Sequence, residues 1–178
     1  DYFAEQNMAY MPVYVEGNKD AKAKLFAGEC DVFTTDASGL ASARAGADNP
    51  EDWVVLPEII SKEPLGPLVR QGDQEWEDVV RWTLFAMINA EEMGITSKNV
   101  DLMLTSKSKE VKRLLGVEGY MGPMLGLGMK FGYNIIKQVG NYGESFDKHI
   151  GLGTPLNLER GLNNLWNNGG ILYVPPFR

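Results

Sequence analysis

The sequence has 178 residues, 44% of them hydrophobic, which is enough to bury the core of one globular domain or of two small lobes. Its 24 acidic and 17 basic side chains give a formal net charge of −7 without a cluster of Lys and Arg, so a nucleic-acid partner is not expected. No apolar run approaches the roughly 20 residues of a membrane-spanning helix, so we expect no insertion into a membrane.

The first residues have the pattern of the middle of a helix, from Asp1 to Met8. They include neither an initiator methionine nor the basic start and apolar core of a signal peptide. These features are typical of a chain that begins inside a longer protein, and we therefore expect an incomplete chain.

Residues 1–63 alternate between extended and helical patterns. Runs of β-branched and aromatic residues predict strands at Tyr10–Val15, Val32–Thr35 and Trp53–Leu56. Capping residues and glycines predict the helices between them, at Lys19–Ala27 and at about Ser38–Ala45. Such alternation indicates an α/β fold, with a parallel sheet that carries helices on its faces.

The stretch Glu58–Val69 has a different composition, with two prolines and a glycine in an extended segment. Proline cannot donate a hydrogen bond to a central strand, so this stretch is expected to be an edge strand or a crossing between lobes. We place the boundary near Glu63, between an α/β lobe at 1–63 and a mostly helical region at 64–178.

The region after the boundary is dominated by helical patterns. Asp73 is a favourable N-cap for a long helix that ends at Gly94. Further helices are predicted at about Asn99–Leu104, Lys109–Leu115 and Phe131–Phe146, and from a Thr154 cap through Trp166. The only strands expected here lie near Leu65–Arg70 and Ile171–Val174. Amphipathic helices of this kind normally cover a sheet, so the scarcity of strands is a second indication of an incomplete chain.

Asp36 follows one predicted strand and precedes a predicted helix. As a structural residue it would cap that helix, because Asp is a favoured N-cap. As a functional residue it would present a carboxylate at the carboxyl end of a strand, where open α/β sheets hold their ligands, and would pair with a cationic group. The two roles are compatible, and the local pattern by itself favours the cap.

Three further residues receive structural interpretations. Cys30 is the only cysteine, and its place at the start of a predicted strand favours a small buried core residue. His149 is the only histidine and has no partners at catalytic or zinc-ligand spacing, so we expect it to face solvent in a last helical turn. Glu144, with Ser145, is similar to the Glu-Ser pair of lytic transglycosylases, but the companion motifs are missing, and we expect a solvated residue near the end of a helix.

Five segments carry a resemblance to a known family. They are Cys30–Leu40, Leu56–Pro67, Val80–Glu92, Val139–Glu144 and Arg160–Trp166. They resemble the periplasmic solute-binding proteins of general L-amino-acid ABC transporters, and the likeness covers nearly the whole chain. The resemblance implies a two-lobed periplasmic-binding-protein-like fold that binds a free L-amino acid in the periplasm and delivers it to a membrane permease. It implies neither a cofactor or metal nor a catalytic residue.

In that family a carboxylate in the Asp-Ala-Ser-Gly position of the second lobe binds the α-ammonium group of the ligand, and Asp36 matches this position. Thr35 is a second candidate, for a hydroxyl contact. A buried carboxylate without a partner is costly, and the ammonium group would supply the missing charge. Residues 1–63 then form part of lobe 2 and residues 64–178 the helical C-terminal part of lobe 1, with a hinge near Ile59–Pro64.

The sequence also departs from the family. It lacks the complete first lobe, with its aromatic walls and the Arg that clamps the ligand carboxylate, and it lacks the Gly-Thr-Thr-Thr-type helix start of the second lobe. It would therefore hold half a site. Members of this branch tend to place a second cysteine before the position of Asp1, so the resemblance implies that Cys30 is the remaining half of a disulfide, as an oxidising periplasm permits.

Two alternatives stay open. The same fold carries enzymes, such as cyclohexadienyl dehydratase-like proteins, because fold does not fix function. Such an enzyme needs an acid over its substrate, and no second carboxylate is convincingly placed beside Asp36. The other alternative, the sensory or substrate-binding lobe of a receptor or a cell-wall enzyme, requires fused segments that this sequence does not contain.

Overall fold

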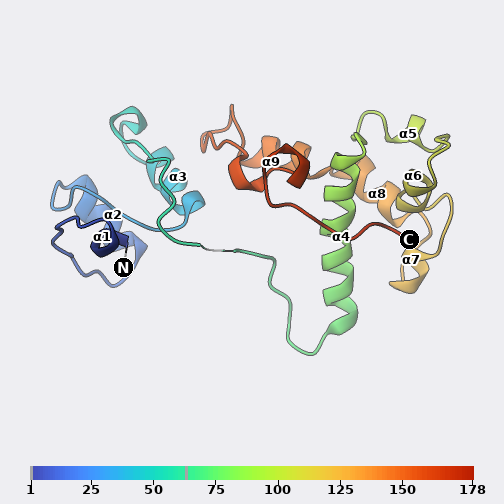
Figure 1. Cartoon of the computed structure of the whole chain (residues 1–178), viewed down its shortest axis with the longest axis horizontal. Helices are drawn as coiled ribbons and strands as arrows, with labels where there is room; N and C mark the ends of the chain where they lie inside the picture. Colours follow the sequence, from blue (N-terminus) through green and yellow to red (C-terminus); the bar gives the residue numbers. More distant parts are fainter. Residues whose placement is uncertain (1, 63) are drawn as a thin grey trace. The chain divides into compact units, whose positions relative to one another are not determined.

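The computed structural model of the chain describes residues 2–62 and 64–178 (Figure 1). The chain divides into two compact units. Unit 1 comprises Asp1–Leu65 together with Pro155–Leu158, and unit 2 comprises Gly66–Thr154 together with Glu159–Arg178. The boundary position predicted at Glu63 and the first residue of the helix predicted from Asp1 lie outside the described residues.

Unit 1 contains short helices joined by irregular segments. They are α1 (Tyr2–Glu5), α2 (Asn18–Phe26), α3 (Ala37–Ala45) and a single 3₁₀ turn, η1 (Pro50–Asp52). The predicted helices at Lys19–Ala27 and Ser38–Ala45 are confirmed to within one residue at each end. Gly28 follows α2 with a φ of 74°, the left-handed conformation that commonly ends a helix.

The strands predicted in this unit are wrong for this structure, because the described residues form no strand. Met11 and Tyr14, in the first predicted strand, are 92% and 89% exposed, and Val54, in the third, is also exposed. A strand of a parallel sheet is fixed by neighbours that cover its faces and pair with its backbone. These apolar segments have no such neighbour among the described residues, so their β propensity alone does not order them.

Unit 2 is organised around α4 (Gln74–Glu92), the long helix drawn in green in Figure 1. The side chain of Asp73 accepts a hydrogen bond from the backbone N–H of Trp76 at 3.1 Å, so the predicted N-cap is confirmed. The remaining helices of this unit are α5 (Val100–Met103), α6 (Lys109–Leu114), α7 (Met121–Met124), α8 (Phe131–Gln138) and α9 (Tyr142–His149). Helices α6, α8 and α9 all pack against α4.

The core of unit 2 combines side chains of α4, α5, α6 and α8 with side chains from the segments that connect or follow the helices. Its buried hydrophobic residues are Ala86, Ala90, Ile95, Val100, Val111, Leu114, Leu115, Phe131, Ile136 and Phe177. Gly132 lets α8 approach α6 closely, because a Cβ at this position would lie 1.9 Å from the carbonyl oxygen of Leu114. Helix-on-helix packing therefore supplies the buried surface that no sheet supplies among the described residues.

The single helix predicted at Phe131–Phe146 is two helices, α8 and α9. Gly140 separates them with a φ of 95°, a left-handed conformation that interrupts a helix. Asn141 then starts α9 with a capping box, in which its side chain accepts from the N–H of Glu144 and the Glu144 carboxylate accepts from the N–H of Asn141, both at 2.9 Å. The apolar pattern on both sides of Gly140 predicted one continuous helix, although Gly140 and the capping residues Asn141 and Glu144 are present in the sequence.

The helix predicted from Thr154 through Trp166 is also wrong. Asn157 and Gly161 have left-handed φ angles, and this stretch contains only the 3₁₀ turns η2 (Gly161–Asn163) and η3 (Trp166–Asn168). The expected strand at Ile171–Val174 is reduced to an isolated parallel bridge between Leu165 and Leu172, and no strand forms at the described residues near Leu65–Arg70.

The C-terminal segment passes across α4, as the red trace in Figure 1 shows. Asn89, which is buried, donates hydrogen bonds to the backbone oxygens of Phe85 and Pro175, at 2.9 and 3.0 Å. The buried ring of Phe177 meets Trp82 edge-to-face, with 5.3 Å between the ring centroids. Within the part of the chain that is described, no helix has the length and apolar character needed to cross a bilayer.

Candidate ligand-binding site

Asp36 stands at the N-cap of α3, where its backbone leaves the irregular segment and enters the helix. Its φ and ψ are −53° and 144°, and its carbonyl oxygen accepts the first helical hydrogen bond, from the N–H of Leu40 at 2.9 Å. The backbone role expected of Asp36 as a helix cap is therefore confirmed. The strand expected before it, at Val32–Thr35, does not form.

The side chain of Asp36 does not take part in this cap. Asp73, Ser108 and Asn141, the N-caps of α4, α6 and α9, each accept a hydrogen bond from a backbone N–H of their own helix, whereas Asp36 accepts none. Asp36 is partly buried, and its carboxylate makes no hydrogen bond or ion pair with any described residue. A carboxylate here lies beside the positive end of the helix dipole and keeps its acceptor positions available.

Thr35 and Gly39 pack together next to this carboxylate. A Cβ on Gly39 would lie 3.0 Å from the methyl carbon of Thr35, 3.7 Å from its hydroxyl oxygen and 4.0 Å from the Cβ of Asp36. The first turn of α3 is therefore in close contact with the side chain of Thr35, which is partly buried. Sequence reasoning treated Gly39 only as the last residue of the Asp-Ala-Ser-Gly motif. Its position four residues after Thr35 is the sequence feature that could have indicated this packing.

Helix α3 is also held at its other end. Arg44, in the last turn of α3, donates a hydrogen bond from Nη2 to the carbonyl oxygen of Leu156 at 3.3 Å. Sequence reasoning missed this contact, because the two residues are 112 positions apart and no local pattern links them.

Glu144 proves to be a structural residue in the first turn of α9. Its carboxylate accepts from the hydroxyl and the backbone N–H of Ser97, at 2.7 and 2.9 Å, in addition to the N–H of Asn141. Burial acts to raise the pKa of Glu144, but these hydrogen bonds outweigh it and hold the pKa below its usual value. Glu144 does lie near the end of a helix, as expected, but the expectation of a solvated side chain is wrong, because its carboxylate is bonded within the protein. A lowered pKa is opposite to what a glycosidic general acid requires.

Two other residues singled out in the sequence are His149 and Cys30. His149 is exposed in the last turn of α9, as predicted. Cys30 carries a free thiol, is only partly buried and starts no strand, so the expectation of a small buried core residue at the start of a strand is wrong. Within residues 2–62 and 64–178, no group of three or more His, Cys, Asp or Glu side chains is arranged to hold a metal ion.

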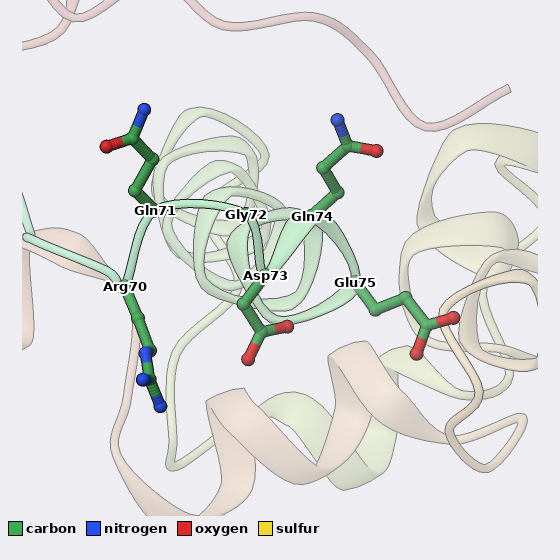
Figure 2. Close-up of a pocket in the computed structure, with 6 residues that line it drawn as sticks. All are labelled: Arg70, Gln71, Gly72, Asp73, Gln74 and Glu75. Carbon is green, nitrogen blue, oxygen red and sulfur yellow. The ribbon is translucent and has the colours of Figure 1, made fainter.

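A hollow at the turn before α4 does not form a site. Six consecutive residues, Arg70–Glu75, line it. Figure 2 shows Gln71 and Gln74 on one side of the turn and Arg70 and Asp73 on the other, so the polar groups diverge instead of converging on one point. The side chain of Asp73 is already used as the cap of α4.

Comparison with known proteins places these observations in context. No protein-family model matches the chain. The whole chain is 54% identical to the general L-amino acid-binding periplasmic protein AapJ of Rhizobium johnstonii and 53% identical to the putative amino-acid ABC transporter-binding protein YhdW of Escherichia coli. It is 51% identical to the glutamate/glutamine/aspartate/asparagine-binding protein BztA of Rhodobacter capsulatus. The chain spans about half the length of these relatives, between 52% and 53%.

A solved structure gives the same result for the fold. An ABC transporter periplasmic binding protein from Brucella ovis, described with glutathione bound, matches with a TM-score of 0.89 and 51% sequence identity. The match covers 99% of this chain and 56% of that one. The predicted resemblance to solute-binding proteins of amino-acid ABC transporters is thus confirmed, and the chain has part of a periplasmic-binding-protein fold. These relatives are described as binding proteins and not as enzymes.

Proposed function

We propose that this chain is part of a periplasmic solute-binding protein that captures a free L-amino acid and delivers it to the permease of an ABC transporter. The observation that carries the proposal is an identity of 51–54% over the whole chain to proteins described as amino-acid-binding components of such transporters. The function consists of binding and release, without bond chemistry.

Asp36 is the proposed ligand group. Its carboxylate accepts no hydrogen bond from its own helix and is paired with no described side chain, so it has the capacity to accept hydrogen bonds from the α-ammonium group of an amino acid. A charge-assisted hydrogen bond of this kind is stronger than a neutral one, and partial burial strengthens it further. Thr35 adds a hydroxyl group beside it.

The proposed domain assignment follows the same scheme. Residues 1–63 belong to the second lobe and residues 64–178 to the helical C-terminal part of the first lobe. The hinge lies near Ile59–Pro64, in a stretch without helix or strand among its described residues. Ligand binding drives closure only if the ligand makes better contacts in the closed state, which requires groups from both lobes.

Glutathione is a second candidate ligand, because the Brucella ovis neighbour is described with glutathione bound. The γ-glutamyl end of glutathione keeps a free α-ammonium group and a free α-carboxylate. A carboxylate that recognises the ammonium group of a free amino acid therefore accepts this end of glutathione in the same way. We expect both ligands to place their α-ammonium group against the Asp36 carboxylate.

The test is calorimetric titration of the complete product of the gene with the twenty amino acids and with glutathione. For the best ligand, Asp36→Asn is expected to weaken binding by about tenfold to a hundredfold, since a hydrogen bond to a charged group contributes about 1.5–3 kcal/mol. Asp73→Asn is the matched control, because Asp73 is also a helix N-cap but uses its side chain for capping. Asn caps helices as well as Asp does, so neither variant is expected to unfold the protein.

A modified ligand sharpens the result. The N-acetylated form of the best amino acid lacks the ammonium charge, and we expect the protein not to bind it. Unchanged affinity in Asp36→Asn, or equal affinity for the N-acetylated ligand, would remove Asp36 from the binding site. Turnover of prephenate or arogenate by the protein would contradict a function limited to binding.

A further inference from the structure

The cations of unit 2 are concentrated in one part of the sequence. Residues 96–137 carry seven Lys and Arg side chains against three Asp and Glu side chains, a formal charge of +4. The whole chain has a formal net charge of −7, so this segment has the opposite sign to the rest. The expectation of a chain without a cluster of Lys and Arg is therefore wrong for this segment.

Three of these cations lie on α6 and act on one carboxylate. Lys112 donates a hydrogen bond to the carboxylate of Glu118 at 2.9 Å. This hydrogen bond lowers the pKa of Glu118, and the nearby charges of Lys109 and Arg113 act in the same direction. The backbone N–H of Glu118 also donates to the carbonyl oxygen of Lys112 at 3.2 Å, so the turn that carries Glu118 folds back onto the end of α6.

Two further cations border α6. Lys107 is exposed and directly precedes Ser108, the N-cap of this helix. Lys130 lies beside the turn that follows α6, because a Cβ on Gly116 in that turn would be 3.2 Å from the Cα of Lys130. These five side chains of unit 2 are called the basic patch below: Lys107, Lys109, Lys112, Arg113 and Lys130.

Most of the basic patch has no counter-charge within the described residues. Lys112 pairs with Glu118, and the other four patch cations form no ion pair with a described residue. Arg160, also in unit 2, differs from them, since its guanidinium donates to both carboxylate oxygens of Glu91 on α4, at 2.9 and 3.1 Å, and both side chains are mostly buried. With the exposed Glu110 and Glu118 included, the basic patch has five positive and two negative charges. Its positive field is therefore available to an external partner.

Large apolar side chains are exposed beside the basic patch. Val117 and Tyr120, in the turn after α6, are 45% and 73% exposed, and Met124, the last residue of α7, is 81% exposed. Helix α6 is fixed from below, because Leu114 and the adjoining Leu115 are fully buried. Tyr, Met and Arg are enriched where proteins contact one another. Exposed cations and apolar groups on a rigid base are therefore typical of a surface that contacts another protein.

We propose that the basic patch is the surface with which this protein docks on the permease of its transporter, and that it contacts carboxylate side chains on the periplasmic face of that permease. The proposal rests on the function proposed above, because a protein that delivers a ligand must dock and leave repeatedly. Exposed charges suit this cycle, since they accelerate association more than they slow release.

A protein surface fits the basic patch better than other anionic partners. Outside residues 96–137 the chain has a formal net charge of −11. An anionic bilayer or a nucleic acid carries negative charge over a wide area and would also repel the neighbouring acidic surface. A local group of carboxylates acts on the patch alone, because charges more than about 8 Å away are screened at physiological ionic strength.

The first experiment reverses two charges of the basic patch in the complete product of the gene. Lys109→Glu with Arg113→Glu is compared with Lys19→Glu with Lys148→Glu, which changes the net charge equally at exposed positions outside the patch. The transporter's permease and its ATP-hydrolysing subunits are reconstituted in phosphatidylcholine nanodiscs, and ATP hydrolysis is measured against the concentration of the amino-acid-loaded protein. The concentration for half-maximal stimulation is expected to rise about tenfold in the patch variant, mainly through slower association, and to stay constant in the control.

The second experiment removes the same charges without reversing them. Lys109→Gln with Arg113→Gln preserves helix propensity, so α6 is expected to remain folded, and thermal unfolding checks this. The half-maximal concentration is expected to rise about threefold, and its dependence on salt between about 0.05 and 0.5 M is expected to weaken. Calorimetry is expected to give the original affinity for the best amino acid in every variant, because the patch does not contact the ligand.

Each contrary result has a specific meaning. If both patch variants stimulate ATP hydrolysis like the original protein while they still bind the amino acid, the docking surface is wrong and the proposed function stands. If the patch variants lose instead the binding to phosphatidylglycerol vesicles, or a salt-dependent self-association, the partner is a lipid surface or a second copy, and the permease contact is wrong. If the complete product binds neither an amino acid nor glutathione and stimulates no ATP hydrolysis, the proposed function fails and the docking proposal fails with it.

Discussion

The two units differ in what fills their interiors. In unit 2 the fully buried side chains include Ile95, Leu114, Leu115 and Ile136, and they come from helices that pack on one another and from the turns that directly follow these helices. In unit 1 the buried hydrophobic side chains among the described residues are those of three alanines, Ala21, Ala41 and Ala43. Helices can complete a core with other helices of the same segment, whereas strand-forming segments need partners across a sheet. We therefore expect the stability of these residues to reside mainly in unit 2.

The largest expected effect tests this difference directly. Leu115 is completely buried, and Leu115→Ala is expected to lower the free energy of unfolding of unit 2 by about 2–5 kcal/mol, because it removes buried methyl groups and leaves a cavity. Leu68→Ala in the same unit is the control, since Leu68 is 99% exposed. Chemical denaturation measures both, and equal losses in the two variants would contradict the assigned core.

The next effect concerns the start of α9. Glu144→Ala is expected to lower the free energy of unfolding by about 1–3 kcal/mol, because it leaves the N–H groups of Asn141 and Ser97 without their acceptor. Glu144→Gln retains an acceptor oxygen and the capping-box geometry, so a smaller loss is expected. Denaturation at pH 7 distinguishes the two variants.

The same carboxylate predicts a pH dependence. The pKa of Glu144 is lower in the folded protein than the ordinary value of 4.5, so its stabilisation is complete above that pH and is lost as the pH falls through the folded value. The difference in stability between the original protein and Glu144→Gln is therefore expected to shrink below about pH 4.5. A difference that stays constant down to pH 2 would contradict this role.

A smaller effect is expected at Gly39, where a substitution is expected to stabilise α3 but to weaken ligand binding. Gly39→Ala raises helix propensity by about 1 kcal/mol, so exchange of the α3 amides is expected to slow by about fivefold. The added Cβ would lie 3.0 Å from the methyl carbon of Thr35, so this side chain must shift by a few tenths of an ångström. We therefore expect ligand affinity to fall by about threefold while α3 becomes more stable. A rise in affinity would separate Thr35 from the site.

The smallest effect is expected on the surface of unit 2. Lys137 pairs with Asp101 at 2.7 Å, and both side chains are well exposed to solvent. Exposed ion pairs contribute little, because water and salt screen the charges. Lys137→Gln is expected to leave the thermal midpoint unchanged, and a clear drop in calorimetry would show that this pair is part of a larger network.

The features that could be predicted from the sequence are those fixed by neighbouring residues. Asp73 caps α4, and glycines follow α2 and α6 with left-handed φ angles at Gly28 and Gly116, because these signals act within one helical turn. The strands could not be predicted in the same way, since pairing depends on partners distant in the chain. The break at Gly140 was visible in principle, but the continuous apolar pattern on both sides concealed it.

The candidate site likewise has features that the local sequence predicts and features that depend on residues distant in the chain. Position 36 could be predicted as a helix start from Asp-Ala-Ser-Gly alone. Its place after a predicted strand made the side chain a candidate ligand group, and only the family resemblance favoured that role over the cap. The absence of a side-chain cap at Asp36 required the structure. The contact between Arg44 and Leu156 and the pair formed by Arg160 and Glu91 join residues 112 and 69 positions apart, which no local pattern encodes. The ligand role of Asp36 and Thr35 stays a prediction.

The depth of the Arg160–Glu91 pair has a consequence for the conditions that the protein tolerates. Added salt shortens the screening length from about 10 Å at 0.1 M to about 3 Å at 1 M, which weakens attraction between charges at the surface. Pairs such as Lys112 with Glu118 are open to this effect, whereas Arg160 and Glu91 are only about one-sixth exposed, and the Arg160 guanidinium also lies over the rings of Tyr142 and Phe146. A change from a dilute medium to seawater would therefore weaken the attraction between the exposed charges of unit 2 and leave the attachment of its C-terminal segment to α4 intact.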